Sequence, residues 1–255
     1  MMKDWKKYLA ELLGTMILTL VGVGTAVVAS LNVAGNQMNF GATGALMLGA
    51  IVWGLTLMGL VYIIGPISGC NVNPAVSLGL ALKKKLSWKD FGFYVVAQII
   101  GAIVGVVLVF AVYALFTQGS AGFDMAVAHT FQVPGVPYVN TMFATLLISA
   151  LLTFVFVLTI IGVIRKSENS AVAGLVIGLT LALVAFATPA VNPAVHLATA
   201  IFGGTDSLKD VWVFLVGPLL GGALAAGIAC LLFKGEDGAK TAPKALDPDK
   251  KHAEK

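Results

Sequence analysis

The chain has 255 residues, of which 58% are hydrophobic and 11% are charged. Soluble domains carry roughly a quarter charged residues, so this composition predicts a membrane protein. The formal net charge of +4 could suggest nucleic-acid binding, but its distribution along the chain, described below, favours another interpretation. The two cysteines, Cys70 and Cys230, both in apolar surroundings, indicate neither a disulfide framework nor a metal site.

Six apolar segments are long enough to cross a bilayer. They lie at about 7–32, 41–64, 90–116, 140–164, 170–187 and 209–233. The first follows a basic N-terminus, as a signal peptide does, but it is too long for the apolar part of one and lacks a clear cleavage site. We therefore expect a retained span. The hydrophilic end, 234–255, has no apolar periodicity and predicts a disordered cytoplasmic tail.

The pentapeptide Val-Asn-Pro-Ala-Val occurs twice, at 72–76 and at 191–195. Each copy opens an apolar run, at about 73–82 and 192–203, that is too short to cross a bilayer. Ten helical residues are about 15 Å long, or half of a hydrocarbon core. Asparagine is a preferred N-cap and proline suits the first helical position, so each copy predicts the start of a half-helix.

Paired half-helices in corresponding places of two apolar halves are typical of a conduction site. The predicted pore midplane consists of Asn73, Pro74, Ala75, Asn192, Pro193 and Ala194. Each asparagine oxygen can cap its helix while the side-chain NH2 stays free to donate into the pore. Each helix start also carries about half an elementary positive charge, which would attract the oxygens of a neutral solute and repel cations. One Asn-Pro-Ala alone would be an ordinary helix cap.

Lysine and arginine gather on one side of the six predicted spans. The clusters are Lys3, Lys6 and Lys7; Lys83, Lys84, Lys85 and Lys89; Arg165 and Lys166; and the tail. Only Lys209 falls on the other side, and the connections 33–40 and 117–139 contain no lysine or arginine. The positive-inside rule then predicts a multi-pass protein of the cell membrane with both termini in the cytoplasm. The basic balance reflects this topology, and we expect no nucleic-acid partner.

Glu11 is the only acidic residue that we place inside a span. We interpret it as a structural buried carboxylate that accepts hydrogen bonds from unwound backbone before the first half-helix. A proton relay is the alternative, but no second intramembrane carboxylate is available to pass the proton. No nucleophile triad, phosphate loop or carboxylate pair is present in a plausible arrangement, so we predict neither an enzyme nor a cofactor or metal. The stretch 124–140 is expected to be a loop over the outer mouth.

Three pairs of glycines have the four-residue spacing that allows helices to approach closely in lipid. They are Gly101 and Gly105, Gly174 and Gly178, and Gly217 and Gly221.

With these features the chain resembles the aquaporin and glycerol-facilitator family over about residues 5–233. The matching segments are Ala-Glu-Leu-Leu-Gly-Thr at 10–15, Ile-Ser-Gly at 67–69, Asn-Pro-Ala-Val at 73–76, Gln98 with 101–105, Asn-Pro-Ala at 192–194, and 212–224. The resemblance implies an all-α passive channel with six transmembrane helices and two re-entrant half-helices, usually a homotetramer with one pore per subunit. It also implies one channel domain, 1–233, made of inverted repeats at about 5–116 and 140–233.

The second half departs from the family pattern. Val195 stands where the family nearly always has arginine, and Ser149 stands where the fourth span usually carries a glutamate that mirrors Glu11. The loop before Asn192 is also several residues short. Together these changes would remove one polar assembly whole, instead of leaving a buried charge without its partner.

By position, the resemblance assigns the selectivity constriction to Trp53, Ala185, Pro189 and Val195. Counting back from Asn192 would give Thr180 in place of Ala185, but the shortened loop favours Ala185. Trp53 is similar to the tryptophan of glycerol-conducting members, and its alternative is an interfacial belt residue. These side chains would form a wide, apolar ring with few hydrogen-bond donors.

His196 directly follows the position that lacks the arginine. It is either a packing histidine or a pore-lining, pH-sensing residue, since histidine titrates near physiological pH.

Three functions stay open at this point. The first is a facilitator of small uncharged solutes, such as glycerol-sized polyols, with some water. The second is a water channel with relaxed selectivity, and the third is a poorly conducting structural protein of the membrane. A coupled transporter would need more ionisable residues in its spans. The expected partners are therefore a neutral solute, water and the lipid bilayer.

Overall fold

The computed structural model describes residues 5–32, 41–119, 122–127, 135–165, 169–188 and 190–234, and within these ranges it contains helices and no strand. The helices are α1 (Trp5–Asn32), α2 (Gly41–Ser68), α3 (Pro74–Leu82), α4 (Trp88–Thr117), α5 (Phe123–Val127), α6 (Tyr138–Ile164), α7 (Ser170–Ala187), α8 (Pro193–Phe202) and α9 (Gly204–Leu232). Six of them, α1, α2, α4, α6, α7 and α9, are long and apolar enough to cross a membrane. The predicted all-α membrane fold is confirmed.

Every predicted span and half-helix corresponds to one of these helices, and the differences lie at their ends. α2 continues to Ser68 and includes Pro66 in its last turn. A proline there removes one backbone hydrogen bond without ending the helix. α9 begins at Gly204, five residues before the expected start. The expected outer loop contains the short helix α5. The tail beyond Lys234 lies outside the described residues.

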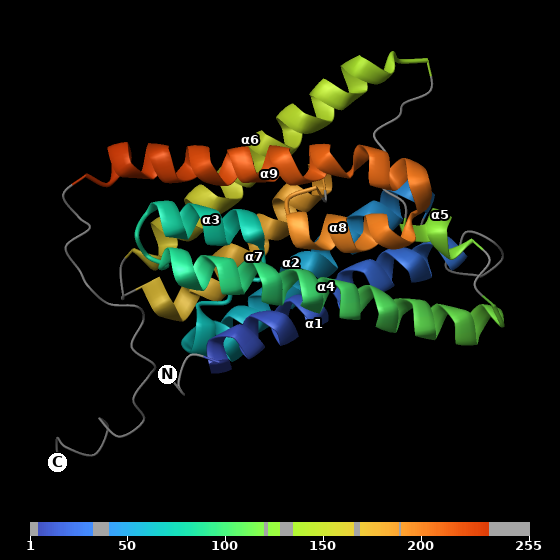
Figure 1. The fold of residues 1–255 in the computed structure, drawn as a ribbon, viewed down its shortest axis with the longest axis horizontal. Helices are drawn as coiled ribbons and strands as arrows, with labels where there is room; N and C mark the ends of the chain where they lie inside the picture. The colour runs from blue at the N-terminus through green and yellow to red at the C-terminus, as the bar shows by residue number, and fades with distance from the viewer. Residues whose placement is uncertain are drawn as a thin grey trace.

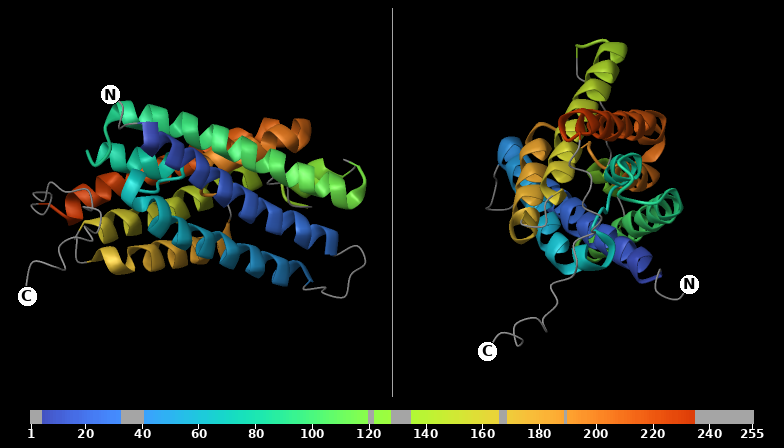
Figure 2. Two further views of the ribbon diagram at one scale, coloured as in Figure 1. Left: turned by 90° about the horizontal axis from the view of Figure 1, so that it is seen from below. Right: turned by 90° about the vertical axis from the view of Figure 1, so that its left-hand side faces the viewer.

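The two halves repeat one arrangement of helices. α1 packs extensively on α4 in the first half, α6 packs in the same way on α9 in the second, and α2 packs on α7 between the halves. The half-helices α3 and α8 lie end to end in the middle of the bundle, as Figure 1 and the two further views in Figure 2 show. The fold is thus an inverted repeat that places two half-helix starts at its centre.

Glycine allows the crossings in each half to be close. A Cβ on Gly101 would collide with the carbonyl oxygen of Leu12, and a Cβ on Gly221 would collide with that of Ala150. The other glycines of the predicted pairs, Gly105, Gly174, Gly178 and Gly217, also meet atoms of a neighbouring helix. The expectation of close helix packing is confirmed at all six positions.

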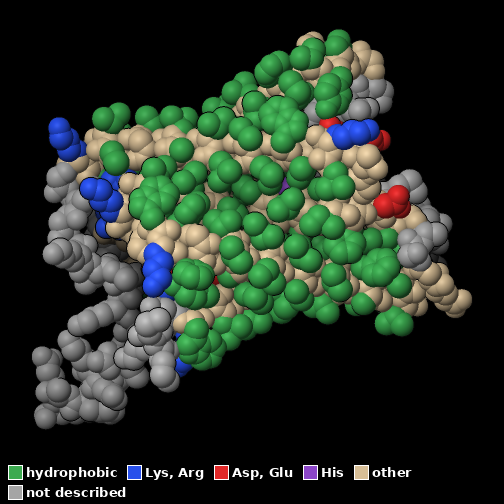
Figure 3. All heavy atoms as spheres, viewed as in Figure 1, with side chains coloured by type: hydrophobic (Ala, Val, Ile, Leu, Met, Phe, Trp, Pro, Cys, Tyr) green, Lys and Arg blue, Asp and Glu red, His purple; other side chains and the backbone are tan. Residues whose placement is uncertain are grey.

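Large apolar side chains cover the outside of the bundle between its two ends. Ile63, Leu147 and Leu183 are among the most exposed of them. In Figure 3 hydrophobic side chains spread over the visible face, most of the lysine and arginine side chains lie at the left-hand end, and acidic side chains lie near the other end. An apolar belt with polar ends is the surface of a multi-pass membrane protein, which this chain is.

Candidate pore

The two asparagines begin the half-helices as predicted. Asn73 has extended backbone, and its Oδ1 accepts a hydrogen bond of 2.8 Å from the backbone N–H of Ala75. Asn192 accepts the equivalent bond, of 3.2 Å, from Ala194. A proline follows each cap at the first helical position, where a backbone N–H is not needed. The repeated pentapeptide therefore folds into the same local structure twice.

Each asparagine amide also reaches across to the other half. Asn73 donates from Nδ2 to the carbonyl oxygen of Val191 at 2.8 Å, and Asn192 donates to that of Val72 at 2.9 Å. The expectation that both NH2 groups stay free was therefore wrong in part. An amide nitrogen carries two N–H groups, so one can hold the opposite loop while the other donates to a solute.

Next to the asparagines lies a small cavity with room for about one water molecule. Its lining residues come from both halves and none of them is charged: Leu18, Trp53, Leu57, Asn71, Val72, Asn73, Phe156, Leu181, Ala185, Val191, Asn192 and Val195. Three of the lining residues are asparagines, and the other side chains are apolar apart from the N–H of the Trp53 indole. The walls therefore suit an uncharged molecule better than an ion, because nothing there replaces the hydration shell of a charge.

The structure brings three of the four predicted constriction residues to this cavity. Trp53 comes from α2, Ala185 from α7 and Val195 from α8. Thr180 is not among the lining residues, and its hydroxyl donates to the carbonyl oxygen of Val176 in its own helix. The fourth predicted residue, Pro189, lies outside the described residues.

Sequence reasoning missed seven of the lining residues: Leu18, Leu57, Asn71, Val72, Phe156, Leu181 and Val191. For four of them a signal was present. Val72 and Val191 belong to the repeated pentapeptide that begins each half-helix. Leu57 lies four residues after Trp53, and Leu181 lies four residues before Ala185, so each shares a helix face with a predicted residue. Phe156 and Leu18 carry no comparable signal, because their approach to the cavity depends on how α6 and α1 cross the other helices.

The buried carboxylate of Glu11 holds the segment before α3. Its Oε1 accepts hydrogen bonds from Ser68 Oγ at 2.7 Å and from the backbone N–H of Asn71 at 2.9 Å. Its Oε2 accepts from the backbone N–H of Val72 at 2.7 Å and from Gln98 Nε2 at 2.8 Å. These include the expected hydrogen bonds from unwound backbone, and they fix the loop whose carbonyl Asn192 contacts.

That loop needs support because its backbone is strained. Gly69, Cys70 and Val72 have positive φ angles of 90°, 51° and 44°. Glycine adopts this conformation easily, but a β-branched valine does so only at a cost of about 1–3 kcal/mol. The hydrogen bond from the N–H of Val72 to Glu11 helps to offset this cost. The sequence before Asn73 thus gives a sharp turn that the carboxylate stabilises.

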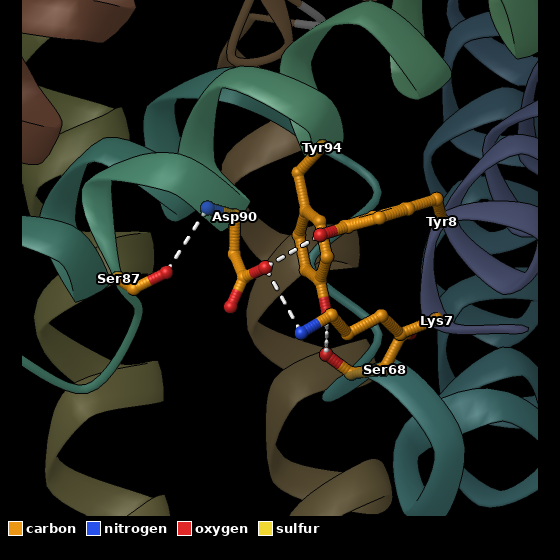
Figure 4. A network of polar contacts seen from close by, with 6 residues as sticks. All are labelled: Lys7, Tyr8, Ser68, Ser87, Asp90 and Tyr94. Atoms are coloured by element: carbon orange, nitrogen blue, oxygen red, sulfur yellow. Dashed lines mark hydrogen bonds and ion pairs between the residues drawn. The ribbon is translucent and has the colours of Figure 1, made fainter. Parts of the chain in front are cut away.

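A second group of polar side chains, drawn in Figure 4, supports the same segment from the helix ends. Tyr94 donates to the carbonyl oxygen of Ser68 at 2.6 Å. Tyr8 and Lys7 both contact Asp90 Oδ1, at 2.7 and 2.9 Å. These contacts join the starts of α1 and α4 to the end of α2, so the loop is held on a rigid frame.

The second half has no equivalent of the Glu11 arrangement among the described residues. Ser149 donates only to carbonyl oxygens of its own helix, those of Thr145 and Leu146. A Cβ on Gly217 would collide with Ser149 Oγ, so α9 lies directly against this position and leaves little room for a longer side chain. Apolar packing against Val213 and Phe214 surrounds Ala190 instead.

His196 lies in this apolar region and not in the cavity lining. It follows Asn192 by four residues, as Ser77 follows Asn73. Ser77 accepts hydrogen bonds from Asn71 and Gln98, whereas His196 is buried and stacks on Phe214 with 4.9 Å between ring centroids. The same place in the two half-helices therefore carries a polar contact in one and a ring contact in the other.

The expectation that Glu11 is the only acidic residue inside a span was wrong, because Asp210 is also buried within a long helix. Asp210 lies in α9, is buried, and accepts a hydrogen bond of 2.6 Å from the hydroxyl of Tyr138. A signal for it was present in the sequence: Ser-Leu-Lys-Asp at 207–210 repeats Ser-Trp-Lys-Asp at 87–90. Both aspartates accept a tyrosine hydroxyl from the helix that their own helix packs on.

Two capped half-helices that meet at the centre of a six-span bundle, beside an uncharged cavity, define a passive channel for water and small solutes, and not an enzyme. The family model described as Major intrinsic protein matches residues 1–229. The chain belongs to this family.

Curated relatives are similar over most of their length. Aquaporin Z of Rhodopseudomonas palustris is 34% identical over 229 residues, which are 87% of this chain and 91% of the relative. Aquaporin Z of Bradyrhizobium diazoefficiens is 35% identical over 234 residues, or 88% and 92% of the two chains. The X-ray structure of the aquaglyceroporin from Plasmodium falciparum matches with a TM-score of 0.73 at 23% identity, covering 89% of this chain and 95% of that one. That structure supports the fold alone.

Proposed function

We propose that the channel conducts small uncharged organic solutes of glycerol size, together with some water, down their gradients. The observation that carries this proposal is the cavity lining, which contains Val195 and Trp53 and no charged side chain. An arginine at position 195 would narrow the passage and add donors that favour water. Valine leaves the wall apolar, so it suits the carbon skeleton of a solute.

In the proposed mechanism each group has a separate task. Asn73 and Asn192 each donate a free N–H to a solute hydroxyl at the midplane. The starts of α3 and α8 face each other, and their partial positive charges oppose the entry of cations. Trp53, Ala185 and Val195 contact the carbon skeleton and set the largest solute that passes. Pro189 completes the constriction in this proposal.

The test is the substitution Val195→Arg, measured by stopped-flow light scattering of proteoliposomes in glycerol, urea and water gradients. We expect glycerol permeability to fall and water permeability to persist, because arginine fills the wall and adds a charge. Val195→Met is the matched control, since it adds length without charge or donors. If glycerol permeability is the same in wild type and Val195→Arg, the assignment of Val195 to the constriction is wrong.

A water channel with relaxed selectivity is the second candidate, and the relatives named Aquaporin Z favour it. Osmotic shrinkage with an impermeant solute, compared with swelling in isosmolar glycerol, separates the two candidates. Permeability close to that of bare lipid for every solute would instead favour a structural role.

The setting of the channel is also part of the proposal. We propose a homotetramer in the cell membrane with both termini in the cytoplasm, and one channel domain over 1–233 with two repeats. Lysine and arginine gathered at one end of the bundle support this orientation. We assign His196 a packing role, supported by its stacking on Phe214 outside the cavity lining.

A further inference from the structure

We infer that Gly22 on α1 sets the position of the Trp53 indole and, through it, the size limit for solutes. The inference rests on the proposed role of Trp53 in the constriction. A Cβ built on Gly22 would lie 2.5 Å from Trp53 Cδ2 and nearer still to Cε2 and Cζ2. Because three atoms of the fused ring are this close, the indole lies directly against the α1 backbone with no side chain between them.

The α1 backbone is not free to move away from the indole. α1 is also held close against α4, where a Cβ on Gly101 or Gly105 would collide with backbone atoms of Leu12 and Met16. α1 and α4 are among the most extensively packed helix pairs in the bundle. A side chain added at Gly22 would therefore have to displace the indole.

The displaced indole has open space on one side. Trp53 packs against both of the larger core clusters and also lines the cavity. Close-packed neighbours do not make room for a ring, so the indole can shift only toward the cavity, which is small enough for a partial shift to obstruct it. Leu18, one helical turn before Gly22, lines the same cavity, so this part of α1 faces the passage. Any side chain at position 22 is thus expected to push the indole into the path of the solute.

Glycine at this position keeps the indole out of the passage, and Gly22→Ala should narrow the passage. We expect the ratio of glycerol to water permeability to fall about tenfold, the lower end of what one methyl group costs in a close-fitting apolar site. Water needs less width and should be affected less. Gly24→Ala on the same helix is the matched control, because its Cβ would make ordinary contact with Val109 Cγ2 at 3.7 Å. It should keep the wild-type ratio.

A double-variant cycle separates this inference from the proposed function. In a Trp53→Ala background the indole is absent, so adding Gly22→Ala should leave the permeability ratio unchanged. If Gly22→Ala alone does not fold, the double variant should fold, since the collision is gone. Failure of the double variant to fold, or an equal effect of Gly22→Ala in both backgrounds, would overturn the inference.

The two single variants decide between the remaining outcomes. If the ratio of glycerol to water permeability in Gly22→Ala equals that of wild type, or shifts toward glycerol, the inference about Gly22 is overturned. The proposal that Trp53 belongs to the constriction still holds in that case, provided that Trp53→Ala changes the ratio. If Trp53→Ala leaves the permeability ratio unchanged, Trp53 is not part of the constriction. The inferred role of Gly22 is then wrong as well.

Discussion

Replacing Glu11 by glutamine tests how the strained loop before α3 is held. The carboxylate accepts four hydrogen bonds, two at each oxygen, from Ser68, Asn71, Val72 and Gln98. Glutamine keeps one acceptor oxygen and turns the other into an NH2 group that faces two donors. Two bonds are lost, each worth about 1.5–3 kcal/mol when an acceptor is charged. We expect Glu11→Gln to lower the free energy of unfolding by about 3–6 kcal/mol.

The measurement is thermal unfolding of the purified protein in detergent, followed by its loss from the monodisperse peak in size-exclusion chromatography. For a chain of this size 1 kcal/mol corresponds to about 2–4 °C, so the midpoint should fall by roughly 6 °C or more. Ser149→Ala is the control from the second half, since it loses only bonds within its own helix. Equal midpoints for Glu11→Gln and Ser149→Ala would refute the view that the carboxylate holds the loop.

Two further predictions concern α8 and α9. His196 stacks on Phe214 away from the cavity lining. Solute permeability between pH 5 and 8 should therefore follow the same profile in wild type and in His196→Phe. A pH dependence that disappears in the variant would show that this histidine gates the pore. Gly221→Val should lower stability by about 1–3 kcal/mol, because the added atoms press on the Ala150 carbonyl. Gly227→Val is the control, because a Cβ at position 227 has open space around it. Equal denaturation midpoints for Gly221→Val and Gly227→Val would contradict the packing argument.

The sequence predicted the fold well because its strongest signals are local. Hydropathy located the six spans, since a lipid-facing helix must be apolar along its whole length. The Asn-Pro pairs located the half-helix starts, since a cap and a first-turn proline act through neighbouring backbone. Helix ends were less certain. α2 runs past Pro66, and α5 lies in the expected loop, because a proline late in a helix and a five-residue turn leave little trace in hydropathy.

The candidate pore was predictable only where a motif or a family position marked it. Trp53, Ala185 and Val195 were named from such positions, and all three line the cavity. Leu18 and Phe156 were not named, because nothing near them in the chain shows that α1 and α6 direct them toward the same space. The second amide contact of each asparagine was missed for a similar reason: its acceptor lies on the opposite half of the chain.

The unequal halves can be understood from the backbone of their two loops. In the first half Cys70 and Val72 adopt positive φ angles, and this strained turn is held by the carboxylate of Glu11. In the second half the described part of the loop has no positive φ angle, and Thr188 Oγ accepts a 3.1 Å hydrogen bond from the N–H of Ala190.

A loop whose described residues have no strained turn does not need a buried acceptor of this kind. The serine at position 149 is then sufficient, because it satisfies its own hydroxyl within α6. With no carboxylate to organise polar groups there, nothing in the described part of the second half would fix the orientation of an arginine at position 195. We therefore interpret this loop, Ser149 and Val195 as parts of one arrangement, which leaves an apolar wall beside the second asparagine.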